Sequence, residues 1–155
     1  MKNFLIMLAA LLIFSQTVMA TGKTPIKIVP AENISTCYDE IQIGDTLLFK
    51  VKNDVYANKQ LVFKQGTNVV GYVSFLNENG WGCDSAELLM NKFQLRDNNG
   101  KIVTLNSEVT INGFELLKTK GSRFAQFFNY IGIVFRGKEI DIKYGIDTPE
   151  FVIWY

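Results

Sequence analysis

Short runs of strand-forming residues recur along the chain about every ten residues, separated by Gly, Asn and Asp. This cadence is typical of antiparallel sandwiches and barrels, in which many short strands are joined by tight turns. The runs span residues 46–52, 67–76, 86–95, 101–105, 108–117, 138–144 and 151–155. The sequence therefore predicts a mainly β domain: a single small antiparallel β-sandwich or partly open β-barrel, with one short helix near 123–135.

Alternation of apolar and polar residues assigns an inward face to several of these runs. The residues expected to face inward are Leu47, Phe49, Val51, Val69, Val73, Phe75, Ile140, Ile142 and Tyr144. Gly71 predicts a bulge or a bend in its strand. Gly113 shifts the apolar phase within 108–117, which we interpret as a strand running to Leu117, paired with 101–105. Residues 77–80 and 97–100 both end in Asn-Gly, which favours tight turns.

One stretch departs from the strand pattern. Apolar side chains recur at helical spacing at Phe124, Phe127, Phe128 and Ile131. Ser122 is a suitable N-cap, so a helix is expected over 123–131, extending as far as 136, although 131–135 also suits a strand. If this stripe belongs to the core, Phe128→Ala should cost about 3–5 kcal/mol. If the stripe is a docking surface, the same change should leave stability nearly unchanged.

The first twenty residues have the features of a signal peptide. Lys2 provides a positive start, residues 4–14 form an uncharged apolar run, and Ala20 is a small residue at the expected cleavage point. The run is shorter than the roughly 20 residues that a membrane-spanning helix needs. Cleavage between Ala20 and Thr21 would leave 21–155 as a single exported β-domain in the periplasm, in the cell envelope or outside the cell.

Export changes the interpretation of Cys37 and Cys83. An even number of cysteines in an exported domain favours a disulfide, and closing a loop of this length would stabilise the fold by about 4 kcal/mol. Two reduced, buried thiols are the alternative. A metal site is not expected, because two cysteines supply half of a tetrahedral set and the chain contains no His to complete it.

Composition excludes several classes of function. Without His, Ser-His-Asp and Cys-His catalysis and His-ligated metals are excluded. Sixteen Lys and Arg stand against fifteen Asp and Glu, and removal of Lys2 with the signal leaves the mature chain formally neutral. No net field would attract nucleic acid, so no nucleic-acid partner is expected. The chain has no phosphate-binding glycine loop and no Gly-x-Ser-x-Gly elbow, and no cofactor is expected.

The remaining functional signal lies near Trp81. This residue sits between two glycines, where its indole could stack on a sugar or a peptide, and Asp84 and Glu87 follow it. The first hypothesis is a non-enzymatic exported domain with a binding or structural role and an envelope glycan or protein as its partner. A small glycan hydrolase using Asp84 and Glu87 is the second. An eight-stranded outer-membrane barrel ending at Tyr155 is the third, although membrane insertion is not favoured because several runs are too short.

Overall fold

The structure is a computed structural model that describes residues 23–37, 41–81, 84–119 and 137–155. The strands are β1 (Pro25–Pro30), β2 (Ile34–Ser35), β3 (Thr46–Val51), β4 (Val55–Ala57), β5 (Gln60–Phe63), β6 (Asn68–Asn77), β7 (Glu87–Arg96), β8 (Ile102–Asn112), β9 (Asp141–Ile142) and β10 (Phe151–Trp154). The helix α2 spans Gly113–Thr119. Among the described residues, no helix combines the length and apolar character needed to cross a membrane.

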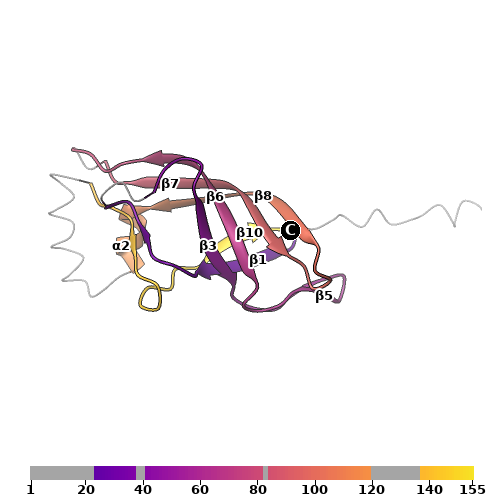
Figure 1. The fold of residues 1–155 in the computed structure, drawn as a ribbon. Helices are drawn as coiled ribbons and strands as arrows, with labels where there is room; N and C mark the ends of the chain where they lie inside the picture. Colours follow the sequence, from indigo (N-terminus) through magenta and orange to yellow (C-terminus); the bar gives the residue numbers. More distant parts are fainter. Residues whose placement is uncertain (1–22, 38–40, 82–83, 120–136) are drawn as a thin grey trace, which may run out of the picture.

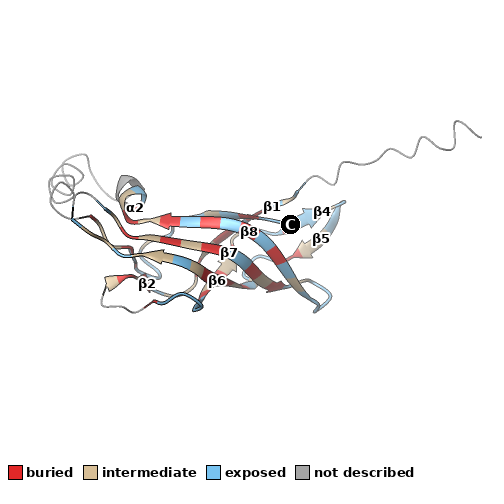
Figure 2. Ribbon diagram, turned by 90° about the horizontal axis from the view of Figure 1, so that it is seen from above, coloured by how far each residue is buried: buried red, intermediate tan, exposed pale blue. Residues whose placement is uncertain are grey.

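The main sheet contains six antiparallel strands in the order β10-β1-β3-β6-β7-β8. It curls until its two edge strands, β8 and β10, lie close to each other, so that the sheet is a nearly closed barrel (Figure 1). Two small ladders, β2–β9 and β4–β5, lie at opposite ends of the barrel (Figures 1 and 2). This architecture confirms the predicted fold class.

The barrel interior is filled by the apolar side chains that alternate along each strand. Figure 2 shows this alternation as buried and exposed bands along β8. Leu47, Phe49, Val51, Val69 and Val73 are all buried, as the sequence predicts. The ring of Phe49 makes edge-to-face contacts with the rings of Phe93 and Phe151, at centroid distances of 6.5 and 6.0 Å. These aromatic pairs join β3 to β7 and to β10 across the interior.

Two positions predicted to face inward are instead exposed. Phe75 is 47% exposed, because the pairing of β6 with β7 shifts register between Tyr72 and Val73 and again between Val73 and Phe75. The first shift skips a residue of β7 and leaves Val73 buried, but the second skips Ser74 of β6, so the alternation along β6 is broken there and Phe75 loses its inward position. Tyr144 is 53% exposed, because β9 is only two residues long and the chain then turns, with the N–H groups of Ile146 and Asp147 donating to Lys143 O. Ile140 and Ile142 are buried as expected.

The prediction that residues 101–105 and 108–117 form a pair of strands was also wrong. One continuous strand, β8, runs to Asn112, and a helix replaces the expected strand from Gly113 onward. The Asn112 Oδ1 atom accepts a hydrogen bond from the Phe114 N–H at 2.9 Å, which is the geometry of a helix N-cap. The helix expected over 123–131, with Phe124, Phe127 and Phe128, lies outside the described residues.

Candidate functional site

The three candidate binding residues lie in and beside the loop that joins β6 to β7, at the end of the barrel where α2 is found (Figure 1). Trp81 is 81% exposed, the largest exposed fraction among the described large hydrophobic residues. Asp84 is exposed, and Glu87 is half-buried at the first position of β7. The structure therefore places an accessible indole and two carboxylates on the same segment of chain.

Hydrogen bonds hold the loop on both sides of the indole. The Gly80 N–H donates to Asp84 O at 2.7 Å, and Gly80 O accepts from the Gly137 N–H at 2.8 Å. The Asn79 side-chain amide donates to Gly137 O at 3.1 Å, and that of Asn77 donates to Asp84 Oδ1 at 3.3 Å. Trp81 thus projects from a backbone that is fixed immediately before it.

A close backbone approach at Gly137 makes this arrangement possible. A Cβ atom added to Gly137 would lie 1.7 Å from Asp84 O, a distance that no side chain can tolerate. Only glycine therefore allows this segment to lie against the Trp81 loop. The loop depends on a residue 58 positions away from Asn79 in the sequence.

The chemistry of Asp84 and Glu87 suits hydrogen bonding. Asp84 uses Oδ1 to accept the Asn77 amide, while its Oδ2 lies near Gly80. Glu87 pairs in register with Asn77 on β6 and with Asn112 on β8, and the following residue, Leu88, is buried in the barrel. Because successive residues on a strand face opposite sides, the Glu87 side chain points away from the barrel interior. Both carboxylates can therefore accept hydrogen bonds from a ligand outside the barrel.

The other sequence candidates have different outcomes. Cys37 is half-buried and forms no disulfide with a described residue, and its N–H donates to Ser35 Oγ at 3.1 Å. Cys83 lies outside the described residues, as do Ala20 and Thr21, so the disulfide and the cleavage site stay predictions. Within the described part of the chain, no group of three or more Cys, Asp or Glu side chains is placed to hold a metal ion.

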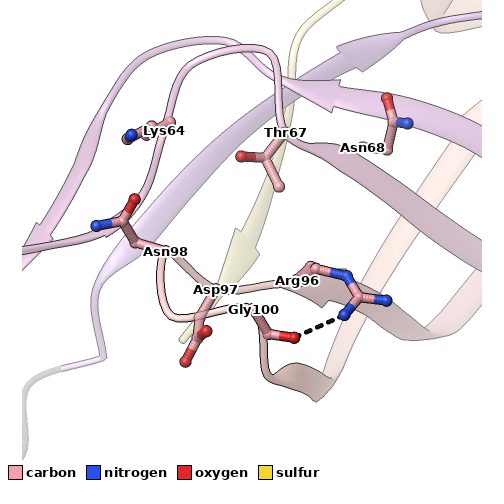
Figure 3. A pocket seen from close by; sticks show the side chains of 7 residues that line it. All are labelled: Lys64, Thr67, Asn68, Arg96, Asp97, Asn98 and Gly100. Carbon is pink, nitrogen blue, oxygen red and sulfur yellow. Dashed lines mark hydrogen bonds between the residues drawn. The ribbon is translucent and has the colours of Figure 1, made fainter.

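A second surface feature, which the sequence analysis missed, lies at the opposite end of the barrel. It is an open depression of about 480 Å³ lined by Lys64, Thr67, Asn68, Arg96, Asp97, Asn98 and Gly100 (Figure 3). Its walls are the turn between β5 and β6 and the turn between β7 and β8. The Asn98 N–H donates to Val62 O at 2.8 Å and so ties one turn to β5. The sequence signal that could have indicated this depression is the position of two basic residues, Lys64 and Arg96, in or beside these turns.

The turn between β7 and β8 is organised by the Asp97 carboxylate. Its Oδ1 atom accepts hydrogen bonds from the N–H groups of Asn99 at 2.9 Å and Lys101 at 2.8 Å. The Arg96 Nη1 atom donates to Gly100 O at 2.7 Å, which orients the guanidinium at the edge of the depression (Figure 3). The turn predicted at 97–100 is confirmed.

The described ion pairs gather at a different point, on the barrel wall. Glu150 pairs with Lys52 and, at 3.4 Å, with Lys27. The hydrogen bond from Lys52, together with the charges of both lysines, holds the pKa of the Glu150 carboxyl below its usual value. This cluster is exposed to solvent, so we assign it a modest structural role.

Comparison with known proteins identifies no relative. The chain matches no protein-family model, and it has no match among curated proteins or solved structures.

Proposed function

We propose that this chain is an exported, non-enzymatic β-domain that binds a cell-envelope glycan through Trp81. The observation that carries the proposal is the 81% exposure of the indole on a hydrogen-bonded loop. An exposed indole offers a large flat apolar face, and tryptophan is enriched among the residues that dominate binding energies. Sugar rings present similar flat apolar faces, rimmed by hydroxyl groups.

The surroundings of Trp81 support a binding role. Because Gly80 is held by hydrogen bonds to Asp84 and Gly137, binding would order little of the backbone immediately before the indole. A site that is already ordered retains more of its contact energy as affinity. Asp84 and Glu87 supply oxygen atoms that can accept hydrogen bonds from sugar hydroxyls beside the indole. One Asp84 oxygen already holds Asn77, which favours a positioning role over proton transfer.

The walls of the barrel support an aqueous location for the exported domain. Polar side chains point outward from β3, β7 and β8, namely Lys50, Lys92, Gln94, Thr104 and Asn106. Lys92 lies over the Tyr72 ring at 5.1 Å, and the Tyr72 hydroxyl donates to Gln94 Oε1 at 2.8 Å. A barrel surrounded by lipid carries the opposite pattern, with apolar side chains outward. This comparison favours the first hypothesis over the outer-membrane alternative.

The proposal is tested by presenting the mature chain to an array of bacterial envelope glycans. Wild type should bind at least one glycan class, and Trp81→Ala should weaken that binding by roughly tenfold or more. Tyr56→Ala is the matched control, because Tyr56 is 57% exposed at the other end of the barrel. It should leave glycan binding unchanged.

Three outcomes would count against the proposal. The first is no binding by wild type to any envelope glycan, and the second is equal loss of binding in the Trp81 and Tyr56 variants. The third is cleavage of a bound glycan that disappears in Glu87→Gln, which would favour the hydrolase. Urea unfolding should show that Trp81→Ala changes stability by less than about 0.5 kcal/mol, so that lost binding is not lost folding.

A further inference from the structure

Charged residues are distributed unevenly between the two ends of the barrel. The hairpin end is defined here as residues 23–25, 52–67, 96–101 and 154–155, which surround the β4–β5 ladder (Figure 1). Its basic residues are Lys23, Lys59, Lys64, Arg96 and Lys101, together with Lys52, whose charge is balanced by its ion pair with Glu150. Its acidic side chains are Asp54 and Asp97. The hairpin end therefore carries a positive net charge, although the mature chain as a whole is formally neutral.

The α2 end has the opposite sign. It is defined here as the described residues of 31–45, 78–87 and 113–147. Its acidic residues are Glu32, Asp45, Glu78, Asp84, Glu87, Glu115, Glu139, Asp141 and Asp147. Its basic residues with described side chains are Lys138 and Lys143. The acidic residues would still outnumber the basic ones if every cation from Lys118 to Arg136 were added.

We propose that the depression at the hairpin end binds the anionic group of an acidic polysaccharide. Lys64 and Arg96 lie on opposite sides of Thr67 in this depression, and Asn68 and Asn98 add side-chain amides (Figure 3). Most polar groups of the lining can therefore donate hydrogen bonds. The Asp97 carboxylate is the acidic group of the lining, and one of its oxygens accepts two backbone N–H groups of its own turn.

The two cations are available to a ligand. Among the described residues, ion pairs form around Glu150 and involve Lys27 and Lys52, not Lys64 or Arg96. The guanidinium of Arg96 uses one nitrogen to bind Gly100 O, which fixes its position and leaves its other donors accessible. A positioned guanidinium can bind a carboxylate or a phosphate through two parallel hydrogen bonds.

A polymer fits this surface better than a single small anion. Lys59 and Lys101, which are not among the lining residues, extend the positive charge beyond the depression, so that successive anionic groups along a chain would meet successive cations. The acidic α2 end would repel the same polymer, which would direct binding to one end only. This site does not depend on Trp81, and its failure would leave the proposed glycan binding through Trp81 untouched.

The experiment measures binding of the mature chain to immobilised polygalacturonate, a phosphorylated mannan and neutral dextran. The first two carry carboxylates and phosphates respectively, so they distinguish the two sources of negative charge. We expect binding to at least one of them, none to dextran, and weaker binding as salt is raised from about 50 to about 200 mM. Trp81→Ala should leave this binding unchanged.

Matched variants locate the site. Lys64→Gln/Arg96→Gln should reduce binding by roughly tenfold or more, whereas Lys50→Gln/Lys92→Gln, which removes equal charge from the barrel wall, should reduce it by about twofold at most. Arg96→Lys keeps the charge and should recover part of the lost affinity. The proposal is overturned if neither acidic polymer binds, or if both double variants weaken binding equally. Salt-sensitive self-association without polymer binding, lost in Lys64→Gln/Arg96→Gln, would show instead that the acidic end of a second copy occupies the site.

Discussion

Replacing Gly71 with Ala tests how tightly the barrel interior is packed. Gly71 lies in the middle of β6, paired with Leu47 on one side and Phe93 on the other. A Cβ atom at this position would lie 2.8 Å from Met90 Sδ, 2.9 Å from Phe93 Cε1 and 3.2 Å from Phe49 Cε2. Contacts this short force neighbouring side chains to move, and both phenylalanine rings are fully buried.

The expected size of the effect follows from two opposing contributions. Overpacking a core usually costs about 1–3 kcal/mol. Replacing glycine in a strand with alanine recovers about 0.5–1 kcal/mol, because the unfolded chain loses less backbone freedom on folding. Two of the contacts are shorter than 3.0 Å, which places the packing cost in the upper part of its range. The net destabilisation should therefore be about 1–2 kcal/mol, which lowers the Tm of a domain of this size by roughly 3–8 °C. Urea and thermal unfolding followed by circular dichroism would measure both quantities.

A double variant separates packing from other causes. Met90→Ala alone should destabilise the barrel by leaving a cavity, but Gly71→Ala/Met90→Ala should be more stable than the sum of the two single changes predicts. The reasoning is refuted if Gly71→Ala leaves stability unchanged or increases it. It is also refuted if the effects of the two substitutions are simply additive.

Three further predictions concern single groups. Ser107 is 7% exposed, and its hydroxyl has no hydrogen-bond partner among the residues that the structure describes. Ser107→Ala should therefore be neutral or stabilising by up to about 1 kcal/mol in urea unfolding, and a clear loss of stability would contradict this. The pKa of Glu150 is lowered in the folded state, so this carboxylate stabilises the fold above its usual pKa of 4.5, and the stabilisation is lost as the pH falls. The Tm of wild type should therefore exceed that of Glu150→Gln near pH 7, and the difference in Tm should vanish near about pH 3. Thiol labelling of exported, denatured, non-reduced protein should detect neither Cys37 nor Cys83, and two labelled thiols would rule out the disulfide.

The inward faces of the central strands were predictable because alternation is a local property. Leu47, Phe49 and Val51 face the interior as their spacing indicates. Alternation failed at Phe75 because the register shifts in β6 depend on its pairing with β7, which the residues of β6 alone do not specify.

The same limit applies to α2. Asn112 is a good N-cap and Glu115 lies in the first turn, but the apolar spacing of Phe114 and Leu116 also suits a strand.

Some elements lacked a strong sequence signal. The turn between β4 and β5 places Asn58 and Lys59 at φ values of 50° and 64°, a conformation usually marked by Asn-Gly. Lysine is uncommon there, so this hairpin was not delimited from the sequence. The Trp81 loop was identified from its glycines, but its contact with Gly137 was not predictable because it joins distant parts of the chain.

The depression at the hairpin end shows why composition alone gave an incomplete account of partners. Because the mature chain is formally neutral, no strong electrostatic field was expected from the molecule as a whole. Net charge, however, is a sum over all residues and does not say where the charges lie. Antiparallel topology brings every second connection to the same end of a barrel, so charges that are spread along the sequence can gather in space. The turns at 64–67 and 97–100 are 30 residues or more apart, yet β6 and β7 place Asn68 and Arg96 beside each other in one lining. A neutral chain with this topology can therefore present a basic surface at one end and an acidic surface at the other. The sequence would predict these two surfaces if the charges of every second turn were added together, because those turns meet at the same end of the barrel.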